Sequence, residues 1–163
     1  MSSTAAAELP NVAEVLAPLL QRVPREQQPL LIAVAERLAA QRYRDWAEDA
    51  VMEPYRQQLL ACADREEDIA RRVEACYPDA AAIQRGLLTT NPELEQINRS
   101  LFADRPLAQQ LTIQAGGERL GAVTWRAFAR PELNASRRAV FLACAELEEA
   151  SAVVLENILG AER

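Results

Sequence analysis

Four glutamates occupy matched positions on the inner rows of predicted helices in this 163-residue sequence: Glu36, Glu66, Glu118 and Glu148. The rows are apolar apart from these acids, except that the row through Glu118 is less clean because it also contains Gln114 and Glu132. A carboxylate that is removed from water must be paired, protonated or bound to a metal ion, because desolvation disfavours its charged form. Four such groups in one core would offer oxygen ligands to a hard metal ion such as Mn or Fe. The competing interpretation places them at stripe edges in ion pairs with Arg, which is nearby for Glu36 and Glu118.

The matched positions belong to an internal repeat. Residues 35–74 align with residues 117–156 at a constant offset of 82 without a gap, and 15 of the 40 aligned pairs are identical. Chance in a chain rich in Ala, Leu, Glu and Arg would give about four, so we infer a duplicated supersecondary unit. In the first copy the identical positions are Glu36, Arg37, Leu38, Ala40, Arg44, Ala47, Arg56, Leu60, Ala61, Cys62, Ala63, Glu66, Glu67, Ala70 and Glu74.

Composition removes several classes of function. The net charge of −6 argues against a nucleic-acid partner, which requires a clustered basic surface. All 18 basic residues are Arg and there is no His, which excludes Ser-His and Cys-His catalysis and imidazole metal ligands. No apolar run approaches the ~20 residues of a membrane span, and residues 1–9 do not resemble a signal peptide. We therefore expect a cytoplasmic protein without a membrane partner.

The three cysteines favour structural roles. Cys62 and Cys144 are equivalent in the repeat and have small apolar neighbours, whereas Cys76 is outside it. Free cysteines often pack as small buried hydrophobes. An odd count and no C-x-x-C pair argue against a disulfide framework.

Helical periodicity extends over most of the chain, and with five glycines it predicts an all-α single domain, residues 1–163. The expected order is a short helix at 10–23, repeat one at 25–77, a crossover at 78–105 with short helices at 80–88 and 92–102, and repeat two at 106–160. Within the repeats we expect long helices at 25–50, 54–77 and 106–130, and a fourth from the N-cap Asn134 to about Gly160. Two helix hairpins joined by a long crossover predict a ferritin-like, up-down-down-up four-helix bundle.

Helical spacing assigns the four acids to inner faces. Glu66 and Glu148 each lie in the middle of a clean apolar row, so we expect both to be buried and to face each other near the bundle axis. Glu67 and Glu149 lie about 100° further round and are expected on the flanks. The two rows are Leu59, Ala63, Glu66, Ala70, Val73 and Tyr77, and Phe141, Ala145, Glu148, Ala152, Leu155 and Leu159.

Two motifs carry a resemblance to a known family. The stretch from Glu36 to Ala47, with aromatic residues at Tyr43 and Trp46, resembles the first-helix motif of rubrerythrins and related ferritin-like proteins. Residues 118–129 repeat that motif. Residues 63–70 resemble the second-helix motif of the family, in which Glu-x-x-His ligates iron.

This resemblance implies a degenerate diiron site. In the family, two helices supply one Glu each and two supply Glu-x-x-His. By position, the ligand acids are Glu36, Glu66, Glu118 and Glu148. Both histidine positions differ, because Ile69 and Ser151 occupy them. Ile cannot ligate a metal, and a neutral Ser hydroxyl is a poor substitute for imidazole.

Three functions follow as expectations. The first is a non-catalytic ferritin-like module, expected as a homodimer, without a cofactor. The second is a redox protein or oxidase that holds Fe or Mn through carboxylates and water. The third is a small-molecule site in the interior, where small residues leave space and aromatic residues form a wall. The alternative, which we favour, is that these aromatic residues are simply part of the core. The small residues are Ala35, Ala39, Gly117 and Gly121, and the aromatic residues are Tyr43, Trp46, Trp125 and Phe128.

Overall fold

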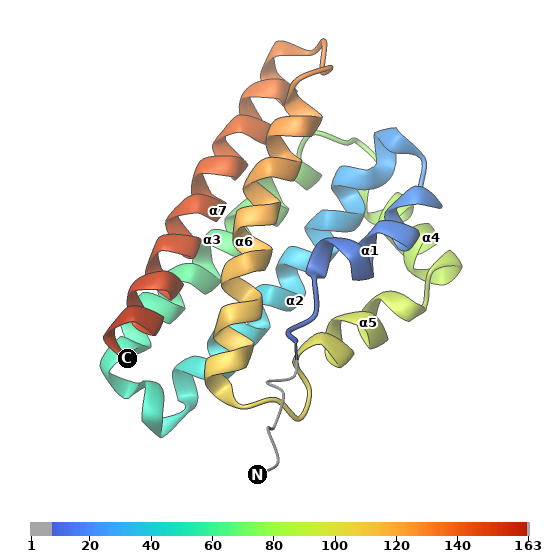
Figure 1. The fold of residues 1–163 in the computed structure, drawn as a ribbon. Coiled ribbons are helices and arrows are strands. Elements are labelled where there is room, and N and C mark those ends of the chain that lie inside the picture. The colour runs from blue at the N-terminus through green and yellow to red at the C-terminus, as the bar shows by residue number, and fades with distance from the viewer. Residues whose placement is uncertain (1–7, 163) are drawn as a thin grey trace.

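The described part of the chain, residues 8–162 of a computed structural model, consists of helices and connecting turns (Figure 1). The expected all-α class is confirmed there. The α-helices are α1 (Val12–Gln21), α2 (Gln28–Glu48), α3 (Arg56–Glu74), α4 (Ala80–Thr90), α5 (Glu93–Phe102), α6 (Leu107–Ala129) and α7 (Ala135–Ala161). Two 3₁₀ helices, η1 (Arg25–Gln27) and η2 (Ala50–Tyr55), precede α2 and α3.

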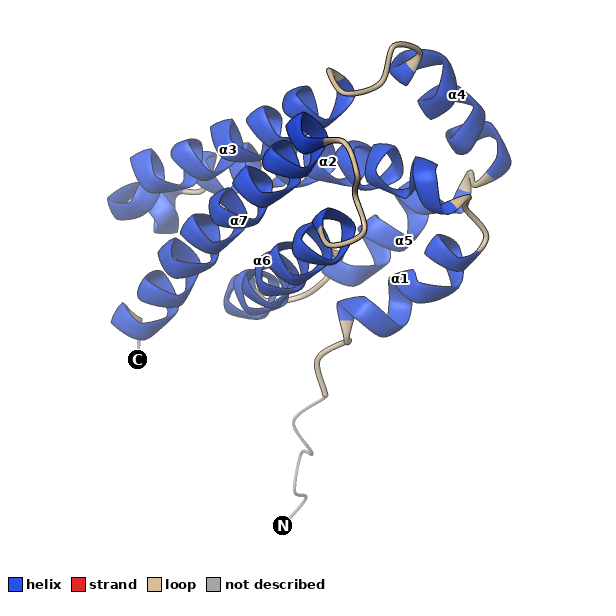
Figure 2. Cartoon of the chain, turned by 90° about the horizontal axis from the view of Figure 1, so that it is seen from above, coloured by secondary structure: helices blue, strands red, loops and turns tan. Residues whose placement is uncertain are grey.

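The four longest helices form two hairpins. Helix α2 packs along α3, α6 packs along α7, and α3 joins the hairpins by packing against α7. Both copies of the sequence repeat therefore adopt the same helix pairing, as expected. The rotation of about 180° that would relate the hairpins stays a prediction. Figure 2 shows α1, α4 and α5 grouped on one side of these helices, where α1 packs on α6 and α4 on α2.

Side-chain caps and prolines set the helix ends. The predicted N-cap Asn134 accepts a hydrogen bond from the backbone N–H of Arg137 at 2.9 Å. The helix expected from residue 54 instead begins at Arg56, because Pro54 lies within η2. Asp49 caps the 3₁₀ turn by accepting from Val51 N–H at 2.9 Å.

Two ion pairs occur in equivalent places on the outer faces of both hairpins. Each joins the first helix of a hairpin to its second helix through an Arg and a Glu. The expected flank position of Glu67 and Glu149 is confirmed, because both belong to these pairs. The pairs are Arg37–Glu74 and Arg44–Glu67 in α2–α3, and Arg119–Glu156 and Arg126–Glu149 in α6–α7.

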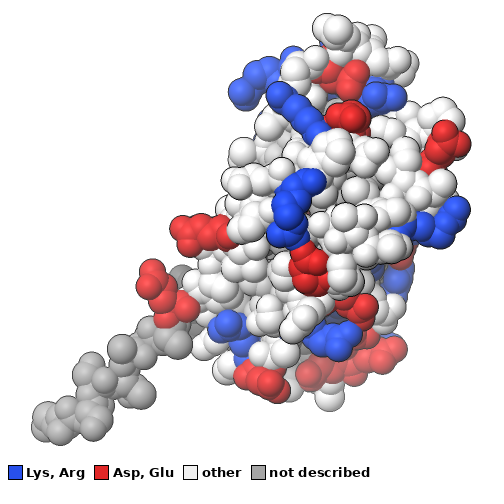
Figure 3. Space-filling view, turned by 90° about the vertical axis from the view of Figure 1, so that its right-hand side faces the viewer, with Lys and Arg blue, Asp and Glu red and all other residues white. Residues whose placement is uncertain are grey.

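The core consists of two clusters of buried apolar side chains. One surrounds Trp125 and includes Cys144, and the other surrounds Tyr43 and includes Cys62. Both cysteines are fully buried and free, as the repeat predicted. On the face that carries α1, α4 and α5, acidic and basic side chains are interspersed with uncharged surface (Figure 3). Within residues 8–162, no helix combines the length and the apolar character that a membrane crossing requires.

Candidate carboxylate site

The four predicted acids lie on four different helices and are all buried. Exposed fractions are 8% for Glu36 on α2, 0% for Glu66 on α3, 1% for Glu118 on α6 and 2% for Glu148 on α7. The prediction that Glu66 and Glu148 are buried is confirmed. In the described part of the chain, none of the four forms a salt bridge, so the interpretation as stripe-edge acids paired with Arg is wrong.

Three of these acids converge. Glu36, Glu66 and Glu148 each present one carboxylate oxygen, and these three oxygens lie within 4.8 Å of one another. This placement brings Glu66 and Glu148 together, as their rows predicted. Because the three side chains come from α2, α3 and α7, the cluster depends on the packing of both hairpins.

Glu118 is held differently, by hydrogen bonds from neutral side chains. Its Oε1 accepts from the Tyr43 hydroxyl at 2.5 Å and from Gln114 Nε2 at 2.7 Å. Gln114 in turn accepts from Arg42 Nη1 at 2.6 Å, which fixes the amide with its NH₂ group toward Glu118. The other oxygen, Glu118 Oε2, is buried and has no hydrogen-bond partner among the described residues.

Glu66 and Glu148 have fewer donors. Trp125 Nε1 donates to Glu148 Oε1 at 2.9 Å, and Ser151 Oγ makes a long hydrogen bond of 3.4 Å to Glu66 Oε1. Glu66 Oε2 is buried without a partner among the described residues. A Cβ atom on Gly121 would lie 2.5 Å from Glu148 Oε1, so the helix can approach this carboxylate only because residue 121 is glycine.

Burial dominates the electrostatics of the cluster. Desolvation raises the pKa of Glu36, and the charge of Glu118 adds to that shift. The pKa values of Glu66 and Glu148 lie well above the ordinary value, first because both side chains are desolvated. Repulsion from nearby acids adds to the shift: Glu118 and Glu36 act on Glu66, and Glu36 and Glu66 act on Glu148. Burial also lowers the pKa of Arg42 to about 10. Without an added cation, the cluster therefore retains protons at pH values where an exposed Glu is ionised.

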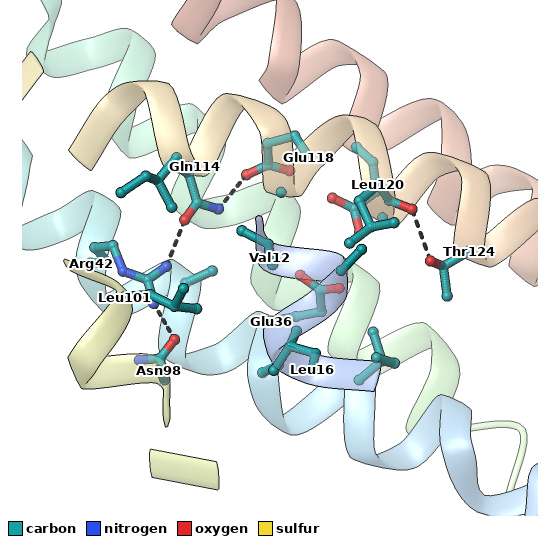
Figure 4. Close-up of a pocket in the computed structure, with 18 of the residues that line it drawn as sticks. Val12, Leu16, Glu36, Arg42, Asn98, Leu101, Gln114, Glu118, Leu120 and Thr124 are labelled. Carbon is teal, nitrogen blue, oxygen red and sulfur yellow. Dashed lines mark hydrogen bonds between the residues drawn. The ribbon is translucent and has the colours of Figure 1, made fainter. Parts of the chain in front are cut away.

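A cavity of about 210 Å³ borders the acids, between α1 and α5 on one side and α2 and α6 on the other (Figure 4). Ala35, Ala39, Gly117 and Gly121 line it, so the small residues leave space as predicted. The aromatic residues do not line this cavity, where aliphatic side chains of α1 lie instead, and the interpretation that they are core residues is confirmed for Tyr43, Trp46 and Trp125. Two of the expected aromatic residues bind the acids instead: Tyr43 donates to Glu118 and Trp125 to Glu148.

Sequence reasoning missed the polar residues around Glu118. Gln114 is one helical turn before Glu118, and its place in an inner row was a signal that could have identified it as a partner. Arg42 and Asn98 gave no such signal. Arg42 also donates to Asn98 and lies 3.7 Å from the Phe102 ring centre, so two residues of the crossover hold its guanidinium group in place.

Comparison of the chain with models of protein families, with curated proteins and with solved structures found no match.

Proposed function

We propose that this protein is a rubrerythrin-like member of the ferritin-like bundles that binds a metal ion, Mn or Fe, through carboxylates alone. One observation carries the proposal: the oxygens of Glu36, Glu66 and Glu148 meet within 4.8 Å in a buried place. Buried carboxylates without a cationic partner are unfavourable unless they are protonated or bound to a metal. Glu66 Oε2, which has no hydrogen-bond partner among the described residues, is a free ligand atom.

The donor set fits a hard cation. Only oxygen ligands are present, and carboxylate oxygens suit ions such as Mn more than ions that require imidazole or thiolate. Such an ion would neutralise the mutual repulsion of the acids and supply a Lewis-acid or redox centre. Trp125 orients the Glu148 carboxylate, while Tyr43 and Gln114 hold Glu118 beside the cluster.

A non-catalytic module without metal is the second candidate, and two observations favour it. Ile69, at a histidine position of the family motif, is fully buried in the apolar core. The raised pKa values of Glu36, Glu66 and Glu148 let these groups remain neutral by holding protons. In a module of this kind, these three acids would stay protonated in the core and bind no metal. The expectations of a homodimer, a cytoplasmic location and no nucleic-acid partner stay predictions.

Calorimetric titration of chelator-treated protein with Mn²⁺ at pH 7.5 separates the two functions. Metal binding predicts a saturable site that Glu66→Gln weakens at least tenfold, because one ligand oxygen becomes a neutral amide. Glu67→Gln is the matched control, since it changes the adjacent acid, which pairs with Arg44 on the flank. Elemental analysis of protein purified without a metal-chelating tag gives an independent answer. No metal in that sample, together with equal weak titrations for parent and variants, would overturn the metal-binding proposal and favour the module without metal.

A further inference from the structure

The cavity beside the acids is lined mainly by hydrocarbon. Helix α1, outside the sequence repeat, contributes one face of small and aliphatic side chains, and α6 supplies Ile113 and Leu120 from the opposite side. Figure 4 shows Val12 and Leu16 of α1 at the cavity that Glu36 also lines. The α1 residues that line the cavity are Val12, Ala13, Leu16, Ala17 and Leu20.

The volume of this cavity limits the size of an occupant. Apolar cavities of about 150 Å³ hold benzene, so by proportion 210 Å³ accommodates roughly eight to nine non-hydrogen atoms, the size of the smallest common fused bicyclic aromatics. The walls include Gly117, where an added Cβ would meet no atom within 4 Å. The space is therefore large enough for a bicyclic aromatic molecule or a short aliphatic chain.

The polar groups at the border specify what such an occupant needs. Glu118 lines the cavity, and its Oε2 is buried without a donor among the described residues. Glu36 and Glu148 also line the cavity, so an anionic occupant would lie beside three acids and be disfavoured. The Arg42 guanidinium is directed away from such a role, since it donates to Gln114 and Asn98 and stacks on Phe102.

We infer that this cavity binds a small apolar molecule bearing one hydrogen-bond donor, with the donor directed to Glu118. Hydrocarbon walls take up the body of the molecule, and an N–H or O–H group satisfies Glu118 Oε2. The inference does not require metal binding, since Glu118 is outside the group of three converging oxygens.

Calorimetry with indole and indene on chelator-treated full-length protein tests this inference. The two probes have nearly the same shape, but only indole carries an N–H donor. We expect indole to bind at one site, and indene to bind about fivefold more weakly because one hydrogen bond is missing. Chelation keeps the outcome separate from that of the metal titration.

Substitution of the cavity wall supplies the second arm. Gly117→Leu places a side chain in the cavity and should reduce indole affinity at least tenfold. Gly86→Leu is the matched control, because Gly86 is also within a helix with no atom near its Cβ position but does not line the cavity. Circular dichroism checks that both variants are folded. Absent indole binding in the parent, or unchanged binding in folded Gly117→Leu, overturns the site, and equal affinities for indole and indene overturn the role of the donor.

Discussion

The two hairpins agree on their outer faces and differ on their inner ones. Outside, both make the same pair of Arg–Glu contacts at equivalent positions. Inside, Tyr43 donates from α2 across to Glu118 of the other hairpin, whereas its counterpart Trp125 donates from α6 to Glu148 of its own hairpin. A frame built from a repeated unit therefore carries an asymmetric site.

The asymmetry extends to the space around the acids. Glu148 is packed against Gly121, while the equivalent residue in the first hairpin is Ala39. Glu118 accepts from two donors, and Ile32 stands in the first hairpin where Gln114 supplies one of them. If the second hairpin had the residues of the first, Ile would replace Gln114 and Glu118 would lose that hydrogen bond. These differences place a hydrogen-bond donor, Gln114, beside Glu118 and leave room for Glu148 against Gly121.

The largest expected effect comes from restoring the histidines at both equivalent positions. Ile69→His combined with Ser151→His adds two nitrogen ligands beside acids that already converge. Substituting a residue that only supports a metal ligand changes metal affinity roughly 10- to 100-fold, so two new ligands should tighten Fe²⁺ binding by more than that. Anaerobic iron titration of the double variant against the parent measures it. Unchanged weak binding in a folded double variant would show that the ligand geometry of the family does not apply to these carboxylates.

Gly121→Ala should displace only the carboxylate of Glu148, the acid that the second hairpin contributes to the cluster. The new Cβ, 2.5 Å from Glu148 Oε1, forces the carboxylate away, so we expect metal affinity to fall about tenfold and stability to fall by about 1–3 kcal/mol. Gly117→Ala, one turn earlier, meets no atom within 4 Å and should stabilise the protein by up to about 1 kcal/mol. Urea unfolding and Mn²⁺ titration of both variants check this. Equal effects of the two substitutions would contradict the close contact at Gly121.

The metal-free protein should lose stability as pH rises from 5 to 8. Glu36, Glu66 and Glu148 have raised pKa values, so the native state holds protons that the unfolded state releases. Their stabilising contribution is complete below the ordinary Glu pKa and is lost as pH rises through the raised values. Glu66→Gln keeps the neutral form at every pH and should exceed the parent at pH 8 by on the order of 1 kcal/mol. Urea midpoints with chelator across this range test it, and parallel pH profiles for parent and variant would refute the assignment.

Sequence periodicity predicted the helices and the burial of the acids because both depend on local spacing. The rows through Glu66 and Glu148 needed only 3.6-residue geometry, and burial followed from their apolar neighbours. The partners of the acids could not be predicted in this way. Tyr43 donates to Glu118, which is 75 positions away in the sequence, and Arg42 donates to Asn98 in the crossover. Such contacts depend on how separate helices pack, which no single-helix pattern contains.

The smallest expected effect is a difference in stability between matched Arg substitutions on the outer faces of the two hairpins. Arg37 pairs with both Glu67 and Glu74, whereas its counterpart Arg119 has Glu156 as its one ion-pair partner within residues 8–162. Their side chains are 44% and 47% exposed, so burial does not bias the comparison.

Exposed ion pairs contribute about 0.2–1 kcal/mol each, so Arg37→Ala should cost a few tenths of a kcal/mol more than Arg119→Ala. Glu67 keeps a second partner in Arg44, which limits the additional loss. The difference should shrink in 0.5 M NaCl, because salt screens exposed charges while leaving packing unchanged. Urea unfolding of both variants at low and high salt measures it. A difference that persists in salt would mean that Arg37 acts through the packing of its alkyl chain, and the outer faces would then be less alike than their ion pairs indicate.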